Sequence, residues 1–299
     1  MGDRMKFVTY KKNDSEKVGV LFNNDEQILD VNSLLKKEYA SMISFINGVS
    51  LDEIKKIDEV LKSNPLDGLV VDTTQVKLLS PIPRPIHDII CVGVNYKDHM
   101  EETKKYDEKF VEPTKTVYFS KRASYIIGDG DLIESRLDLD EELDYEVELT
   151  VIIGKTGVNI KKEEVEDYIF GYSIFNDISS RKLQMSHLQW YRGKSLDTYS
   201  SMGPSILHKS ALPFPVEVDI KSELNGEVRQ KSNTKLFVAD IAQIISEISD
   251  GITLEAGDII ITGTPSGVGM GMNPKGYMKK GDIIRCEILE IGKLTNIVK

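Results

Sequence analysis

The stretch Leu143-Asp-Tyr-Glu-Val-Glu-Leu-Thr-Val-Ile-Ile153 decides both the fold and the candidate site. Side chains of an extended strand alternate between two faces. One face then receives the apolar side chains Tyr145, Val147, Leu149 and Val151. Glu146 and Glu148 share the other face, about 6–7 Å apart at ~3.3 Å of rise per residue. Two carboxylates this close repel each other unless both reach solvent or share a cation. The pattern therefore indicates either a solvated strand face or a metal site.

A second β-rich run supplies a third carboxylate. Gly171–Phe175 is followed by Asn176-Asp177, so Asp177 stands at the end of a predicted strand. Three carboxylates from neighbouring strands form an all-oxygen site, which suits Mg²⁺ or Mn²⁺, with Ca²⁺ as a third candidate. The alternative for Asp177 is a turn or helix N-cap. Zinc is disfavoured, because the four histidines form no HExxH pattern.

Positive charge gathers just after this run. Arg181, Lys182, Arg192 and Lys194 lie within a short stretch, and Lys194 follows Gly193, where a backbone can approach another group closely. Lys194 could neutralise a carboxylate or a developing enolate. A surface salt bridge is the alternative.

The overall charge argues against several classes of partner. The chain of 299 residues has a net charge of −10, which disfavours nucleic acid and anionic membrane surfaces. No membrane span and no signal peptide are predicted, so we expect a cytoplasmic protein. Two cysteines, Cys91 and Cys286, indicate reduced, buried thiols rather than a disulfide framework.

The chain divides at a proline-rich segment, Ser80–Pro85. Before it, two β-rich runs precede one helix expected from Asn32 to Gly48 and a second that starts with a capping box at Ser50. After it, strands outnumber helices without regular alternation, which excludes a doubly wound fold. We therefore predict a β-rich α+β protein, with a small N-terminal α+β domain at 1–80 and a larger domain at 81–299.

Gly263–Gly271 forms a glycine-rich loop after a predicted strand. It lacks the GK[ST] of a P-loop, and no helix follows it as in a dinucleotide-binding loop. An anion-binding nest that includes the Thr264 hydroxyl and a plain turn both remain open.

Five motifs, in this order along the chain, resemble the fumarylacetoacetate hydrolase superfamily. They are Val92-Gly-Val-Asn-Tyr-Lys-Asp-His-Met-Glu-Glu102, Asp144-Tyr-Glu-Val-Glu-Leu149, Gly171-Tyr-Ser-Ile-Phe-Asn-Asp-Ile-Ser-Ser-Arg181, Gln189-Trp-Tyr-Arg-Gly-Lys-Ser-Leu-Asp197 and Ile261-Thr-Gly-Thr-Pro-Ser-Gly-Val-Gly269. The likeness runs from about residue 85 to the C-terminus.

The resemblance implies a role for nine residues. The family's metal-binding acids fall on Glu146, Glu148 and Asp177, and its active-site lysine falls on Lys194. Its His and Glu, three residues apart on a short lid helix, fall on His99 and Glu102. The substrate-contacting positions are matched by Arg181, Gln184 and Thr264. A mixed β-roll fold and a homodimer are also implied.

His99 and Glu102 lie one helical turn apart, so the carboxylate can orient the imidazole as a general base. The hypothesis is hydrolytic C–C cleavage of an acylpyruvate-type β-diketo acid through a pyruvate enolate, with a small anionic 2-oxo acid as the partner. Decarboxylation or tautomerisation of oxaloacetate, and isomerisation or hydration of a 2-oxo-alkenoate, remain open on the same residues. A metal-stabilised binding protein without chemistry is the alternative from another class.

Overall fold

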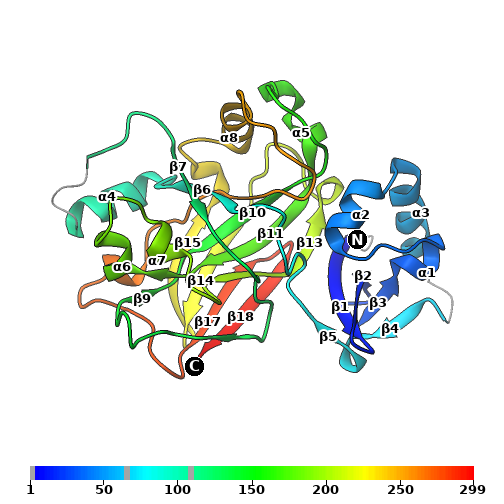
Figure 1. Cartoon of the computed structure of the whole chain (residues 1–299), viewed down its shortest axis with the longest axis horizontal. Helices are drawn as coiled ribbons and strands as arrows, with labels where there is room; N and C mark the ends of the chain where they lie inside the picture. The colour runs from blue at the N-terminus through cyan, green and yellow to red at the C-terminus, as the bar shows by residue number, and fades with distance from the viewer. Residues whose placement is uncertain (1–3, 64–67, 107–110) are drawn as a thin grey trace.

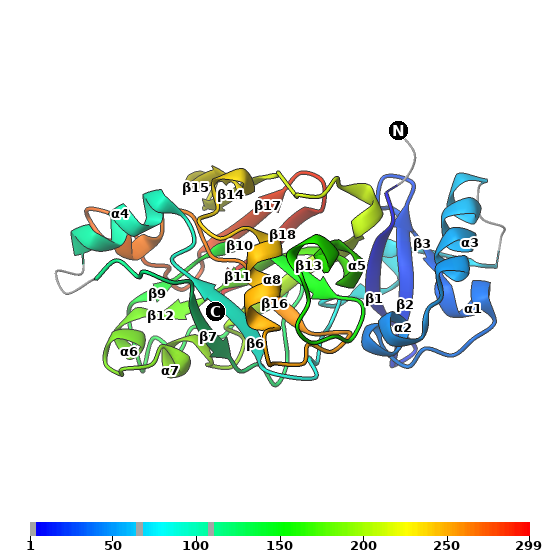
Figure 2. The ribbon, with the colours of Figure 1, turned by 90° about the horizontal axis from the view of Figure 1, so that it is seen from above.

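A computed structural model describes residues 4–63, 68–106 and 111–299 of the chain. It confirms the predicted β-rich α+β class, with strands forming open sheets, groups of helices at the two ends of the molecule and further helices over the central strands (Figures 1 and 2). The glutamate-bearing stretch lies in the middle of the largest sheet.

The largest sheet runs through the whole molecule and has eleven strands within the described residues. Its strands, in spatial order, are β4 (Val70–Asp72), β3 (Gln27–Asp30), β2 (Ser15–Phe22), β1 (Lys6–Lys12), β13 (Ser200–His208), β11 (Ile169–Asp177), β10 (Val147–Ile153), β16 (Ile259–Ile261), β6 (Ile89–Gly93) and β7 (Val117–Lys121), with β5 (Lys77–Leu78) beside β1. β16 and β6 pair in parallel. The pairs of β10 with β11 and with β16 are antiparallel.

A second sheet packs on one face of the central strands. Its strands are β15 (Glu227–Asn233), β14 (Asp219–Leu224), β17 (Ile283–Ile288), β18 (Gly292–Val298) and β8 (Leu132–Ile133). A third, two-stranded sheet joins β12 (Ser179–Ser180) to β9 (Leu143–Asp144). Leu149 and Val151 of β10 share one apolar core with Ile220 and Ile284 of the second sheet. The predicted apolar face of β10 is therefore the face buried between the two sheets.

The helices fall into groups by position. They are α1 (Val31–Leu35), α2 (Met42–Gly48), α3 (Leu51–Lys62), α4 (Lys97–Tyr106), α5 (Val165–Tyr168), α6 (Arg181–Met185), α7 (Tyr191–Lys194) and α8 (Ile241–Ile248), with 3₁₀ turns η1 (Thr73–Gln75), η2 (Lys162–Glu164), η3 (Lys209–Ala211), η4 (Thr234–Leu236) and η5 (Gly269–Gly271). α1, α2 and α3 lie beside the N-terminal strands, whereas α4, α6 and α7 lie at the opposite end of the molecule (Figures 1 and 2).

The single helix expected from Asn32 to Gly48 is wrong. α1 ends at Leu35, because the next residue, Lys36, takes a left-handed conformation with φ of 53°. α2 starts afresh at Ser41, whose side chain and that of Ser44 cap each other's backbone N–H groups. This reciprocal cap satisfies donors that a continuous helix would not expose. The capping box at Ser50 is confirmed.

The N-terminal strands continue the sheet of the larger region. β1 pairs with β13 through Lys6 with Leu207 and Phe7 with Ile206. One apolar core also joins residues of the two regions, such as Phe45 and Phe175. The division at residue 80 stays a prediction.

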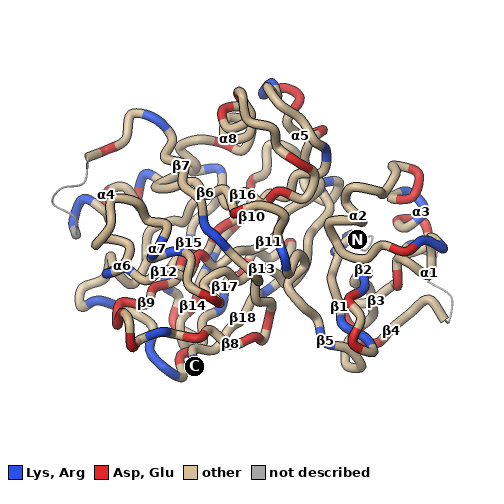
Figure 3. The backbone as a smooth tube through the Cα atoms, viewed as in Figure 1, with Lys and Arg blue, Asp and Glu red and all other residues tan. Residues whose placement is uncertain are grey.

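Both cysteines, Cys91 and Cys286, are buried free thiols, as predicted. Acidic and basic residues are interspersed along the backbone (Figure 3). Within the described residues, we find no helix with the length and apolar character needed to cross a membrane.

Candidate active site

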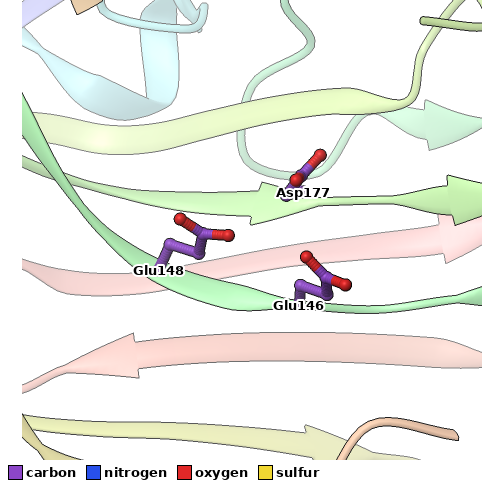
Figure 4. Close-up of side chains that lie close together, drawn as sticks. All are labelled: Glu146, Glu148 and Asp177. Carbon is purple, nitrogen blue, oxygen red and sulfur yellow. The ribbon is translucent and has the colours of Figure 1, made fainter. Parts of the chain in front are cut away.

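Glu146, Glu148 and Asp177 converge at the centre of the large sheet (Figure 4). One carboxylate oxygen of each lies within 4.8 Å of the others. All three residues are buried, with 6%, 2% and 0% of their surfaces exposed. A solvated strand face, the simpler alternative for the two glutamates, is therefore wrong.

Strand pairing brings the three acids together. β10 and β11 are antiparallel neighbours, and the Asp177 N–H donates to Glu146 O at 2.8 Å. Side chains at such cross-strand positions lie on the same face, about 5 Å apart at Cβ. Glu148 lies two residues further along β10 and so faces the same side. Asp177 is the last residue of β11 rather than a helix cap.

Basic side chains contact two of the three acids. Lys194 Nζ lies 2.7 Å from both Glu146 Oε2 and Asp177 Oδ2. Arg181 Nη1 lies 2.6 Å from Glu146 Oε1, and Lys121 Nζ lies 2.5 Å from Asp177 Oδ1. Burial would raise the pKa of Glu146, but Lys194 and Arg181 outweigh burial and lower that pKa to about 2. Burial would lower the pKa of Lys194, but Asp177 and Glu146 raise it.

Glu148 differs from the other two acids. It accepts a hydrogen bond at 2.5 Å from a backbone amide, that of Gly263. Burial raises its pKa well above the usual value, and the neighbouring charges of Asp177 and Glu146 raise it further. A cation bound among the three carboxylates would stabilise the ionised form of Glu148 and so oppose this rise in its pKa. Three converging carboxylates also match the all-oxygen ligand set that hard divalent cations prefer. The residues present therefore fit a divalent metal ion.

A cavity of about 80 Å³ opens beside the acids. It is lined by seven of the nine predicted site residues: His99, Glu146, Glu148, Arg181, Gln184, Lys194 and Thr264. Asp177 is the third member of the carboxylate cluster with Glu146 and Glu148, and Glu102 contacts His99. Apolar side chains, including Phe119 and Trp190, form another part of the wall. The structure therefore brings together all nine residues.

His99 and Glu102 lie on α4 and form a contact between His99 Nδ1 and Glu102 Oε2 at 2.8 Å. Their side chains are only 9% and 12% exposed. A carboxylate at Nδ1 fixes the ring orientation and leaves Nε2 as the nitrogen that can accept a proton. A surface pair, the simpler alternative, does not match this burial.

The predicted substrate-contacting residues already have protein partners. Arg181 Nε donates to Asp144 Oδ2 at 2.9 Å, and Arg181 Nη1 donates to Gln184 Oε1 at 3.0 Å. The Thr264 hydroxyl donates to Val147 O at 2.9 Å and accepts from Gln230 Nε2 at 2.7 Å. The proton of this hydroxyl is therefore committed to the protein backbone, which limits the part it can play in an anion nest.

Gly193 has the close contact that its position suggested. An ideal Cβ at Gly193 would lie 2.5 Å from Gln184 N, so a larger residue would push α7 away from α6. This close packing brings Lys194 to the carboxylates.

Sequence reasoning missed two residues of the site. Asp144 is fully buried and accepts hydrogen bonds from Arg181, Gly269 N and Met270 N. The two-residue period that selects Glu146 and Glu148 extends back to Asp144, so this signal was available. Lys121 is also fully buried. Lysine is usually exposed, so nothing in the sequence around Lys121 indicates that it belongs to the site.

Comparisons with known proteins agree with this geometry. Residues 88–299 match the family model described as fumarylacetoacetate (FAA) hydrolase, C-terminal. The chain is 38% identical to the oxaloacetate tautomerase YisK of Bacillus subtilis, over 98% of this chain and 99% of that protein.

Solved structures cover almost the whole chain. The fumarylacetoacetate hydrolase of Exiguobacterium antarcticum matches with a TM-score of 0.83 and 38% identity, over 99% of each chain. The maleylpyruvate hydrolase of Sphingobium sp. SYK-6, solved with manganese(II) and pyruvate, matches with a TM-score of 0.76 and 29% identity, over 98% of each chain. The chain belongs to the fumarylacetoacetate hydrolase family and is a metal-dependent enzyme of that family.

Proposed function

We propose that this enzyme forms and stabilises the enolate of a small 2-oxo acid, and that keto–enol tautomerisation of oxaloacetate is its reaction. The observation that carries the proposal is one cavity with three kinds of group at its wall: the cluster of three carboxylates, two cations and the buried His–Glu pair. The relative that is 38% identical along nearly its full length and named an oxaloacetate tautomerase favours this reaction.

The proposed metal ligands are Glu146, Glu148 and Asp177. A divalent cation bound there would polarise the 2-oxo oxygen and stabilise negative charge on it as a Lewis acid. Mg²⁺ and Mn²⁺ are our candidates, and the manganese in the maleylpyruvate hydrolase structure supports the second.

The chain's own residues would handle the proton and the anion. His99 Nε2 would remove a proton from C3 of the keto acid, while Glu102 holds Nδ1. Arg181, Gln184 and Thr264 line the cavity where we place the substrate carboxylate, and Lys194 supplies positive charge beside the developing oxyanion. The proton that His99 has taken from C3 would then be returned to the 2-oxo oxygen, which completes the enol, so no atom is gained or lost.

Hydrolysis of an acylpyruvate is the second candidate, supported by the maleylpyruvate hydrolase with pyruvate. In this reaction His99 would take a proton from water, and the resulting hydroxide would attack the distal carbonyl. The C–C bond would break to leave an acid and the pyruvate enolate, which is then protonated at C3.

The test compares two assays on the Mn²⁺-loaded and Mg²⁺-loaded enzyme. We expect rapid decay of the ultraviolet absorbance of the oxaloacetate enol, and little pyruvate release from acetylpyruvate. The reverse result would replace tautomerisation by hydrolysis, and inactivity toward both would reject the proposal. His99→Ala should lower kcat about 10²–10⁴-fold while Mn²⁺ affinity stays the same.

Two further properties rest on the resemblance and the composition. We infer a homodimer, to be checked by light scattering, and a cytoplasmic location, to be checked by fractionation of the cells.

A further inference from the structure

The helix that carries the His99–Glu102 pair is fastened to the glycine-rich loop. Asp98 Oδ2 accepts a hydrogen bond from the Ser266 hydroxyl at 2.7 Å. Glu102 Oε1 accepts one from the Gly267 N–H at 2.9 Å. α4 also packs against η5, the 3₁₀ turn at the end of this loop. These contacts hold α4 over the cavity that His99 and Thr103 help to line.

Each of these two carboxylates uses its second oxygen on His99. Asp98 Oδ1 accepts from the His99 backbone N–H at 2.9 Å, and Glu102 Oε2 contacts His99 Nδ1 at 2.8 Å. Both carboxylates therefore link the loop to the histidine, one through its backbone and one through its ring. A shift of α4 relative to the loop would disturb both links.

The loop itself is firmly held. Asp144 accepts from Gly269 N at 2.7 Å and from Met270 N at 2.9 Å. Gly267 has φ of +105°, and an ideal Cβ there would lie 2.0 Å from Arg229 O, so the backbone fits this place only as glycine. The loop is thus held in place by its own contacts, and α4 is positioned by its hydrogen bonds to this loop.

We propose that Ser266 is a positioning residue for the general base. Its hydrogen bond to Asp98, beside the Gly267–Glu102 bond, sets the place of His99 over the cavity. Ser266 is absent from the cavity lining, so it acts through Asp98 rather than on the substrate. This inference rests on the proposed function of His99.

The test uses the single tryptophan of the chain. Trp190 lines the same cavity as His99, so its quenching by acrylamide reports how well α4 covers the cavity, independently of turnover. The variants are Ser266→Ala, Ser266→Thr, which keeps the hydroxyl, and the control Ser63→Ala at the end of α3, which also loses one exposed hydroxyl bond.

We expect Ser266→Ala to lower kcat about tenfold, the effect of losing one hydrogen bond to a charged group. Its Trp190 quenching constant should rise, and its Mn²⁺ affinity should stay the same. Ser266→Thr should keep kcat and the quenching constant at their wild-type values, and Ser63→Ala should change neither of them. Wild-type kcat and quenching in Ser266→Ala would overturn the inference.

Gly271→Ala supplies an independent variant. An ideal Cβ at Gly271 would lie 2.1 Å from Glu102 Oε1, so the alanine should displace this carboxylate from Gly267 and His99. We expect the same rise in quenching and loss of turnover, and unchanged values would mean that the contact between α4 and the loop, through which Ser266 is proposed to act, does not position His99. If the wild type is inactive toward every 2-oxo acid but the quenching changes occur, the proposed function fails, and Ser266 is left with only a structural role in holding α4 over the cavity.

Discussion

The two halves of the candidate site are supported in different ways. Glu146, Glu148 and Asp177 stand on or beside two central strands, and their neighbours Lys121 and Lys194 are buried with them. His99 and Glu102 stand on a helix of ten residues that rests on a loop. Regions with many buried contacts open only with the whole fold, whereas short peripheral elements open locally. The three acids, which form the metal-binding half, should therefore lose their arrangement only when the whole protein unfolds. His99 and Glu102, which form the proton-transfer half, should lose theirs when α4 alone opens.

Charge distinguishes the halves as well. With Asp144 included, the metal-binding half has four carboxylates but only three cations, Lys121, Arg181 and Lys194, so one carboxylate has no cationic partner of its own. Desolvated charges cost several kcal/mol each unless they are paired. Removing one member of a charged pair should thus lower the free energy of unfolding in the metal-binding half but not in the proton-transfer half.

The largest expected effect on stability comes from Lys121→Met. The substitution leaves Asp177 without the ammonium at 2.5 Å, so we expect a loss of about 3–5 kcal/mol in the free energy of unfolding, measured by urea titration. The control is Lys221→Met, which breaks partly exposed pairs with Glu223 and Glu287 and should cost less than about 1 kcal/mol. Equal losses in the two variants would remove the distinction between the halves.

Glu148→Gln should separate metal binding from folding. The substitution removes a formal charge from the proposed ligand set, so we expect Mn²⁺ affinity to fall by at least ~100-fold in a calorimetric titration. In the metal-free protein the same change removes a carboxylate crowded by Asp177 and Glu146, and thermal stability should rise.

The matched control for Glu148→Gln is Glu223→Gln, which lies on the second sheet and should leave Mn²⁺ affinity unchanged. Wild-type Mn²⁺ affinity in Glu148→Gln would argue against Glu148 as a ligand. A lower stability of the metal-free variant would argue against the charge crowding.

The sequence predicted what depends on local periodicity. The two-residue period placed Glu146 and Glu148 on one face, and helical spacing placed His99 beside Glu102. It could not predict the burial of Lys121, because only the pairing of β6 with β7 and the packing around Asp177 enclose this lysine. The break between α1 and α2 was missed for a related reason, since apolar spacing continues through residues that a left-handed Lys36 and a cap at Ser41 take out of the helix.

The smallest effect on stability should come from Glu102→Gln. The glutamine oxygen can still accept from Gly267 N–H, so we expect the free energy of unfolding to change by less than about 1 kcal/mol. Its amide N–H₂ would then face His99 Nδ1, which forces the ring proton onto Nε2 and removes the proposed base. We therefore expect kcat to fall by about 10²-fold without a change in Mn²⁺ affinity. Glu101→Gln on the same helix alters an exposed pair with Lys104 and should leave kcat unchanged. A loss of stability in Glu102→Gln as large as that in Lys121→Met would mean that α4 and the central sheet unfold as one unit, and it would remove the distinction between the two halves.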